Sequence, residues 1–158
     1  FAPTSKEMEY RPFFTDYVVL IVSADHPWAK RDRIAIEELI DTNFIMRDDQ
    51  SGTRQEVQMF LQEKGFSIDD LRVVMEIGNA EAISMAVEEG IGAAFVSRAV
   101  ARRGIGLGKI KEVRVDGLSL KRKIYIAYNH RHPITQGQTA FLDFINEPEN
   151  LMLLKAAA

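Results

Sequence analysis

The stretch N-F-I-M-R-D-D-Q-S-G-T-R-Q-E, residues 43–56, is the part of the chain from which the fold can be worked out. Its apolar residues 44–46 predict a short strand, and residues 54–64 carry apolar side chains at helical spacing. A polar turn that leads from a strand straight into a helix leaves the first N–H groups of that helix without intrahelical partners. Because these groups and the positive end of the helix dipole point to one place, the turn can hold an anion.

The same turn also has a purely structural interpretation. Thr53 and Glu56 have the spacing of a capping box, in which each side chain satisfies a backbone N–H group at the start of the helix. Capped helix starts are common, so the turn by itself favours a structural role over a ligand site.

Composition excludes several classes of protein. The chain has 158 residues, of which 46% are hydrophobic and 27% charged, as expected for a folded protein of about one domain. Its formal net charge of -3, with both signs interspersed, lacks the basic footprint of nucleic-acid binding. Cysteine is absent, which excludes disulfides and thiolate catalysis. No membrane span or signal segment is recognisable, so we expect a cytoplasmic protein without a membrane partner.

Apolar runs alternate with helical patterns along the chain, which predicts parallel βαβ units. Strands are predicted at residues 17–22, 43–47, 71–77, 91–96, 109–115 and 122–128. Helices are predicted at residues 34–40 and 54–64, between Asn79 and Gly90, after Ser97 and after Thr135. Residues 1–14 are expected to be irregular because of Pro3 and Pro12. In the last helix, the buried face is expected to consist of Ala140, Phe141, Phe144 and Ile145.

Three of the predicted strands end in small or polar residues. Ser51, Gly52 and Thr53 follow the first, Asn79 follows the second, and Ser97 ends the third. In open α/β sheets, ligands bind outside the carboxyl ends of the strands, so these corners are expected to line one crevice. Their convergence favours the ligand interpretation of Ser51 and Thr53.

No catalytic or metal-binding constellation is recognisable. His130 and His132 are one residue apart and have no third ligand within sequence reach, which indicates a surface position. His26 indicates local turn structure, and Asp48 and Asp49 precede a helix start, where negative charge is favoured in any case. The glycine spacings match neither a dinucleotide nor a P-loop fingerprint. We therefore predict no metal, no cofactor and no enzymatic activity.

The order of these motifs resembles the effector-binding domain of LysR-type transcriptional regulators. The matching segments are V-V-L-I-V-S-A-D-H-P-W-A, I-A-I-E-E-L-I, F-I-M-R-D-D-Q-S-G-T-R, V-V-M-E-I-G-N-A-E-A-I-S-M-A-V-E-E-G-I-G-A-A-F-V-S and K-R-K-I-Y-I-A-Y, which together span nearly the whole chain. The D-H-P-x-A turn, S-G-T-R and E-A-I…G-x-G are specific in combination. The resemblance implies an α/β fold of two lobes, like the type II periplasmic binding proteins, with a small-molecule inducer in the cleft between the lobes.

The resemblance also implies how the chain is divided. Residues 1–22 correspond to a partial first lobe and a crossover strand, residues 23–110 to a complete second lobe, and residues 111–158 to the return crossover and the closing part of the first lobe. Residues 17–22 and 122–128 are then expected to be adjacent crossover strands. In the family, a winged helix-turn-helix and an opening strand and helix of the first lobe precede this region. We therefore expect a half-lined cleft, and contact with DNA only through a domain outside this sequence.

The resemblance implies that the effector contacts of this chain lie at helix starts, at the cleft edge and at the crossover. The expected ligand-binding residues are Ser51, Gly52, Thr53, Asn79, Phe95, Ser97 and Thr4. Because two helix N-termini point at this place, we expect the ligand to be a small anion.

The resemblance further suggests a homo-oligomer, with a dimer face along the predicted helix 54–64 and strand 71–77. Met59 lies off the apolar stripe of that helix, which suits an exposed position in such a face. Two other functions remain open, a solute-binding protein of a transporter and an enzyme on the same fold, such as a prephenate dehydratase-like or phosphoribosyltransferase-like protein. The lack of a signal segment counts against the first, and the lack of an acid–base set counts against the second.

Overall fold

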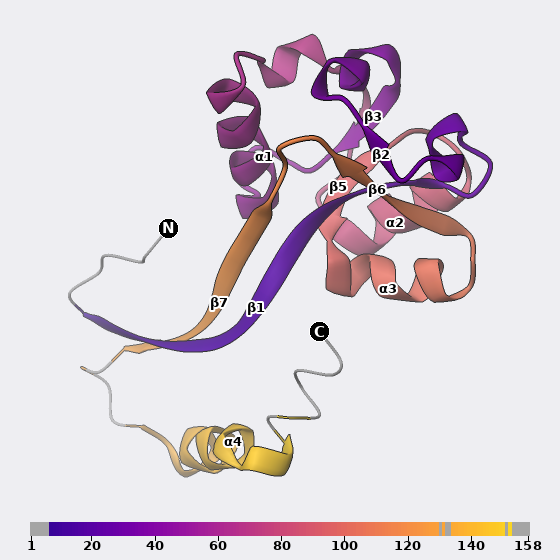
Figure 1. Ribbon diagram of the computed structural model, residues 1–158. Coiled ribbons are helices and arrows are strands. Elements are labelled where there is room, and N and C mark those ends of the chain that lie inside the picture. Colours follow the sequence, from indigo (N-terminus) through magenta and orange to yellow (C-terminus); the bar gives the residue numbers. More distant parts are fainter. Residues whose placement is uncertain (1–6, 130, 132–133, 151, 153–158) are drawn as a thin grey trace. The chain divides into compact units, whose positions relative to one another are not determined.

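The computed structural model describes residues 7–129, 131, 134–150 and 152, and the chain divides into two compact units (Figure 1). The smaller unit combines Phe1–Asp16 with Arg122–Ala158, and the larger unit is Tyr17–Lys121. The larger unit contains the whole of the segment 23–110 that the resemblance assigns to the second lobe.

The elements follow the order that the sequence patterns predict. The strands are β1 (Met8–Ser23), β2 (Arg33–Ile34), β3 (Asn43–Met46), β4 (Arg72–Glu76), β5 (Ala94–Ser97), β6 (Ile110–Val115) and β7 (Leu120–Asn129). The α-helices are α1 (Gly52–Glu63), α2 (Ala80–Glu88), α3 (Arg98–Gly106) and α4 (Gln136–Asn146). Three short 3-10 helices are η1 (Pro27–Lys30), η2 (Ile36–Asp41) and η3 (Ile68–Asp70), so the helix expected at 34–40 is of the 3-10 type.

The strands of the larger unit follow one another in the order β4-β3-β5-β1-β6-β2. β1 runs antiparallel to both β5 and β6, and β6 pairs with β2 in parallel. β3 pairs with β4 in parallel and touches the β5 segment through a parallel bridge between Phe44 and Ala93. The sheet of this unit is therefore mixed but mostly parallel, because of its strands only β1 runs against the common direction. β3, β4, β5 and β6 all run one way, so their carboxyl ends lie along one edge.

Gly92 allows the segment before β5 to approach β3 closely. A Cβ atom at Gly92 would lie 2.7 Å from the carbonyl oxygen of Asn43, which is too close for any side chain. Without one, the Ala93 N–H donates to that same oxygen at 2.8 Å, and the Ile45 N–H donates to the Ala93 carbonyl at 2.8 Å. The glycine spacing after α2 therefore serves strand packing.

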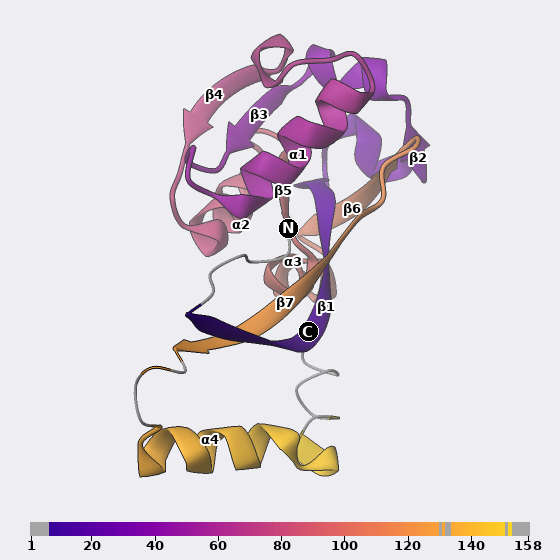
Figure 2. The same ribbon diagram turned by 90° about the vertical axis from the view of Figure 1, so that its left-hand side faces the viewer.

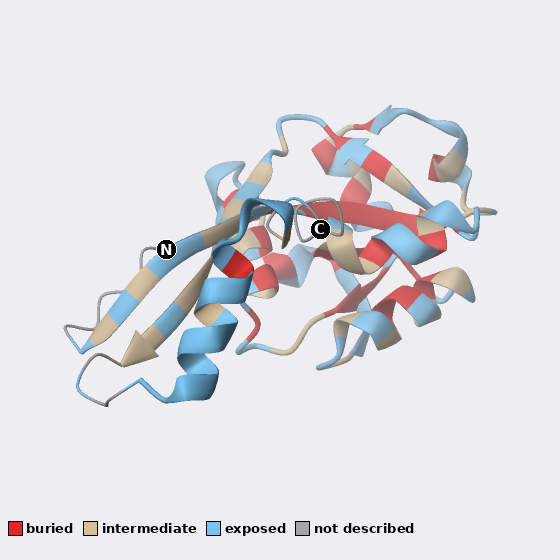
Figure 3. Cartoon of the chain, turned by 90° about the horizontal axis from the view of Figure 1, so that it is seen from below, coloured by how far each residue is buried: buried red, intermediate tan, exposed pale blue. Residues whose placement is uncertain are grey.

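Helices cover both faces of this sheet, which explains the continuous apolar run at residues 17–22. Val18, Leu20 and Val22 of β1 belong to one apolar cluster that includes the buried face of α1. Val19 and Ile21 belong to a second cluster with buried residues of α2 and α3. Figure 3 shows the corresponding buried stretches along the strands and helices of this unit. The sheet is thus the middle layer of a three-layer α/β unit.

In the smaller unit, the first half of β1 pairs with β7. Within the expected crossover strand 17–22, Leu20 and Ile21 lie between β5 and β6. The adjacency of segments 17–22 and 122–128 therefore stays a prediction. Arg122 donates from Nε to Asp16 Oδ2 at 2.8 Å, and its Nη2 lies 2.7 Å from the same oxygen. The expectation that residues 1–14 are irregular is wrong from Met8 onward, where β1 begins. In the described part of the chain this half of β1 has β7 as its only strand partner. Pro12 is tolerated because every second N–H of such a strand points away from that partner.

The buried face expected for the last helix is only partly present. Thr135 and Gln138 form the predicted capping box at the start of α4, and Ile145 is buried. Ala140 is exposed, and Phe141 and Phe144 are 56% and 55% exposed. The described strands of the smaller unit supply too few neighbours to cover the whole apolar stripe. None of the described helices combines the length and apolarity that a membrane crossing requires.

Candidate functional site

Three helices start where parallel strands end, at one edge of the larger unit (Figure 2). Ser51 is the N-cap of α1 after β3, Asn79 is the N-cap of α2 after β4, and Ser97 is the N-cap of α3 at the end of β5. Because the three strands share one direction, the three helix N-termini carry their partial positive charge to the same edge of the sheet.

The start of α1 contains a serine hydroxyl that makes no hydrogen bond with any residue that the structure describes. Ser51 is 6% exposed, and among the residues that the structure describes its side chain makes no hydrogen bond, although its backbone groups bond to Asp48 and Gln55. At the adjoining Gly52, a Cβ atom would meet no heavy atom within 4 Å, so the space above its backbone is open. The Ser51 Oγ atom itself keeps contact with solvent, so the hydroxyl can bond to water or to a ligand.

The expected capping box of Thr53 and Glu56 is wrong. The helix begins at Gly52 and its N-cap is Ser51, so Thr53 lies inside the first turn and cannot be the capping residue. Thr53 is 6% exposed, so its side chain lies against the body of the larger unit. The spacing alone could not place the first helical residue, since helix boundaries inferred from pattern shift by a residue or two.

Arg54 holds the turn before α1 in place, a role that its position in the helical pattern did not indicate. Its Nη1 donates to the Arg47 carbonyl and to Glu76 Oε2, both at 2.8 Å, and its Nη2 lies 2.7 Å from Asp49 Oδ1. The side chain is only 17% exposed. Arg54 therefore ties the first turn of α1 to the preceding turn and to the end of β4. The acidic residues in those two places were the sequence signal for this clamp.

An acidic side chain lies between the first two helix starts. Asp48 Oδ2 is 3.5 Å from the position that a Cβ atom of Gly78 would take, and 3.4 Å from Arg47 Nη2. The helix N-termini favour an anion, while this carboxylate repels one. An anionic ligand is therefore better placed beside Ser51 and Gly52 than beside Gly78.

Asn79 and Ser97 each use a side-chain oxygen as a helix cap. Asn79 Oδ1 accepts from the Ala82 N–H at 2.8 Å, and Ser97 Oγ accepts from the Ala99 N–H at 3.2 Å. The Asn79 side chain is exposed, and its amide Nδ2 donates to no atom in the described part of the chain. Asn79 thus keeps a donor available at the edge of the sheet while its oxygen holds α2.

The other expected site residues lie elsewhere. Phe95 is 2% exposed, and its ring stacks on Phe44 with centroids 5.9 Å apart, inside the core. This ring supports the sheet and offers no open surface to a ligand. Thr4 lies outside the described residues, as do His130 and His132. The described residues contain no group of three or more histidine and acidic side chains that could hold a metal ion.

Comparison with known proteins identifies the family. Residues 1–148 match the family model described as the LysR substrate binding domain. The chain belongs to this family. It is 34% identical over 143 residues to an uncharacterized HTH-type transcriptional regulator of Methanocaldococcus jannaschii, covering 90% of this chain and 48% of that protein. It is 33% identical over 144 residues to the HTH-type transcriptional activator CmpR of a Synechocystis strain, covering 90% of this chain and 46% of that protein.

This LysR domain spans less than half the length of those two relatives. Among solved structures, it is similar to the CcmR regulatory domain of Synechocystis PCC6803 in complex with 2-PG. That match has a TM-score of 0.76 at 29% identity and covers 97% of this chain and 70% of the other. The fold is therefore the type II periplasmic-binding-protein-like α/β fold of LysR regulatory domains, as the resemblance implied. The relatives are transcriptional regulators, which disfavours the transporter alternative.

Proposed function

We propose that this chain is the effector-sensing and oligomerisation module of a cytoplasmic LysR-type regulator, and that it binds a ligand without catalysing a reaction. The relatives named as HTH-type regulators are more than twice as long as the matched region, which supports a separate DNA-binding domain in the longer protein. Positive and negative residues are interspersed in this chain, which lacks a basic footprint and so agrees with DNA binding by a separate domain.

The effector site that we propose is the start of α1, and the Ser51 hydroxyl is the observation that carries it. Its Oγ atom keeps contact with solvent, so a ligand can form a hydrogen bond there, which contributes about 1.5–3 kcal/mol when the partner is charged. The open space above Gly52 gives a ligand access to the first N–H groups of the helix. Thr53 on the same turn and the free Nδ2 of Asn79 are further polar groups of this site.

The ligand that we propose is a small anion. The convergence of helix N-termini supports this charge, and the Asp48 carboxylate restricts the anion to the Ser51 side of the corner. The CcmR regulatory domain, a relative at 29% identity, was solved in complex with 2-PG, which supports a small-molecule effector for this chain too. We therefore take 2-PG as the first test ligand.

Calorimetric titration of the longer regulator tests the site. A thermal-shift screen of small anions, beginning with 2-PG, supplies the ligand. The variants Ser51→Ala and Thr53→Val should each bind it about 1–3 kcal/mol more weakly, because each leaves a ligand group unpaired. Since Ser51 makes no capping bond, Ser51→Ala should leave the free energy of unfolding nearly unchanged.

Ser67→Ala is the matched control. Ser67 Oγ accepts from the Asp69 N–H at the start of η3, so this change removes a true cap. It should lower stability by about 0.5–2 kcal/mol and leave ligand affinity unchanged. If Ser51→Ala behaves like Ser67→Ala, losing stability and not affinity, the start of α1 is only a helix cap and the site assignment fails.

The oligomerisation surface that we propose comprises β4 and the outer side of α1. Met59 is 43% exposed, and all five residues of β4 are exposed, although three of them are the apolar Val73, Val74 and Met75. A run of exposed apolar residues on an edge strand is a feature that proteins normally cover. A second copy of the chain would cover this surface, in agreement with the dimer face that the resemblance to the family implies.

A further inference from the structure

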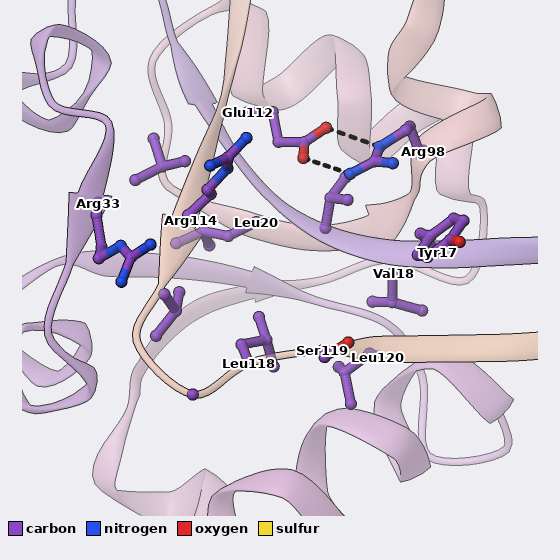
Figure 4. A pocket seen from close by; sticks show the side chains of 14 residues that line it. Tyr17, Val18, Leu20, Arg33, Arg98, Glu112, Arg114, Leu118, Ser119 and Leu120 are labelled. Atoms are coloured by element: carbon purple, nitrogen blue, oxygen red, sulfur yellow. Dashed lines mark hydrogen bonds and ion pairs between the residues drawn. The ribbon is translucent and has the colours of Figure 1, made fainter.

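A cavity in the larger unit takes no part in the site proposed above. It has a volume of about 340 Å³ and lies where β1 runs beyond its last paired residue with β6, Leu20 opposite Val113 (Figure 4). Its walls come from β1, β2, β6, the start of α3 and residues 117–120. The volume lies within the range of small-molecule sites, and none of the residues at the starts of α1 and α2 line it.

Two arginines in this cavity face each other across neighbouring strands. Arg33 on β2 is the direct partner of Arg114 on β6 in a parallel pair, and partners in register project to the same side of a sheet. Arg33 has a partial counter-charge in Asp116, 3.1 Å away, with both side chains more than half exposed. Arg114 makes no ion pair or hydrogen bond with any described residue. Like charges held opposite each other are unfavourable, and an anion between them would remove that cost.

The acidic residue of the cavity is already neutralised. Glu112 accepts two hydrogen bonds from Arg98, from Nε at 2.9 Å and from Nη2 at 2.6 Å, as the dashed lines in Figure 4 mark. The guanidinium of Arg98 also lies over the ring of Tyr17, 5.0 Å from its centroid. This bidentate pair forms a fixed wall of no net charge. Because Asp116 partly offsets the charge of Arg33, the uncompensated positive charge of the cavity lies mainly on Arg114.

Apolar side chains form the opposite wall. Leu118 and Leu120 lie across the cavity from Arg98 and Glu112 in Figure 4, and Val18 and Leu20 of β1 line it between them. A cavity with a cationic end and an apolar wall matches a molecule with an anionic end and a short hydrocarbon body.

We propose that this cavity binds a small organic dianion, held between the guanidinium groups of Arg33 and Arg114. The planar guanidinium fork fits carboxylate and phosphate equally, so the shared chemistry is a doubly charged oxyanion on a short carbon body. A phosphate monoester and a dicarboxylate both have this chemistry. Because no residue at the starts of α1 and α2 takes part, the cavity gives the domain a second ligand input that is independent of the first.

The test is a titration of the chain with inorganic phosphate and, separately, with succinate, at an ionic strength held constant with sodium chloride. Binding is followed by the amide proton and nitrogen shifts of Gly117 and Ser119, which line the cavity. Saturable shifts are expected with at least one of the two anions. Arg114→Gln should weaken that binding about tenfold, and Arg33→Gln should do the same if Arg114→Gln does not fold. A response to phosphate alone indicates a phosphate ester, and a response to succinate alone indicates a dicarboxylate.

Arg103→Gln is the matched control, because it removes the same charge from an exposed position of α3 outside the cavity. It should bind both anions as the unchanged chain does. Shifts that do not saturate, or an equal loss of binding in Arg103→Gln and Arg114→Gln, would show that the anions only screen surface charge, and the proposal would be overturned. Ser51→Ala should keep the full response. A weaker response of the cavity in Ser51→Ala would show that the two sites are not independent. Loss of effector binding at the start of α1, with the cavity response unchanged, would leave the proposal for this cavity intact.

Discussion

His26 holds the turn after β1 through both of its ring nitrogens. Its Nδ1 accepts from the Trp28 N–H at 3.2 Å, and its Nε2 lies 3.1 Å from Thr42 Oγ1, a residue on the far side of η2. The ring also packs edge-on against Trp28, with centroids 4.8 Å apart. Nδ1 can accept only while it carries no proton, so this arrangement requires the neutral imidazole. His26 therefore has the local structural role that the D-H-P turn indicated.

Mild acid should weaken the fold through His26. Burial lowers the pKa of His26 from its ordinary value of 6.5, so the unfolded chain takes up this proton more readily than the folded chain. The stability that depends on neutral His26 is complete above about pH 6.5 and is lost as the pH falls through the lower pKa of the folded state. Urea unfolding at about pH 7 and about pH 5 measures this loss.

His26→Asn is the control for that measurement. Asparagine keeps an acceptor for the Trp28 N–H and does not titrate, so the variant should be less stable near neutral pH and should lose less on acidification. If the variant and the unchanged chain lose the same stability between the two pH values, other groups cause the acid sensitivity and His26 does not.

At the scale of the element, β4 is the strand that the chain leaves uncovered. Its pattern reads as an ordinary strand, yet all five of its residues are exposed and β3 is its only strand partner in the described part of the chain. Figure 2 shows it at the outer edge beside β3. An edge of this kind carries unpaired backbone groups next to apolar side chains, which together favour pairing with another chain.

Met59→Glu should reduce self-association of the chain. A charge placed in an apolar interface remains partly desolvated on association, so the dimer should weaken by about tenfold or more. Sedimentation velocity across a concentration series measures the change. Met85→Glu is the matched control, because Met85 is 67% exposed on α2, a helix that is not part of the proposed surface. A chain that stays monomeric at high concentration, or equal effects of the two substitutions, would contradict the proposed surface.

At the scale of the whole molecule, the two apolar clusters belong entirely to the larger unit. Every buried residue in them comes from the segment 18–115, and β5 and β6 flank β1 within it. The described part of the smaller unit contains a helix with two half-exposed phenylalanines and two strands. Stability is therefore concentrated in Tyr17–Lys121.

Residues 17–121 expressed alone should fold cooperatively. In this segment α1, α2 and α3 still cover both faces of the sheet. The removed segments contribute no buried residue to either of the two apolar clusters. Urea unfolding followed by circular dichroism should give one sigmoidal transition. Within this segment Phe44→Ala, which empties a fully buried site, should cost about 3–5 kcal/mol. A broad transition that Phe44→Ala does not change would mean that the clusters need the smaller unit.

The sequence alone determined features that depend on neighbouring residues. Asn79, Thr135 and Gly90 marked helix ends correctly, because capping and positive φ are decided within one turn of the backbone. Continuous apolar runs located β5 and the second half of β1, since a strand covered on both faces has no polar side. The order of these local motifs was enough to indicate the LysR family and its fold.

Tertiary structure decided what depends on register and on neighbours distant in the chain. Helical spacing made Phe141 and Phe144 core candidates, but burial requires a partner surface, and the described strands do not supply one. Arg33 and Arg114 meet only because β2 and β6 pair in one register, which no local pattern encodes. Likewise, Ser51 was recognisable as a polar residue at a helix start, whereas its lack of a hydrogen-bond partner is a property of the surrounding packing. Pairing and packing act over the whole chain, so these features appear only once the layers are assembled.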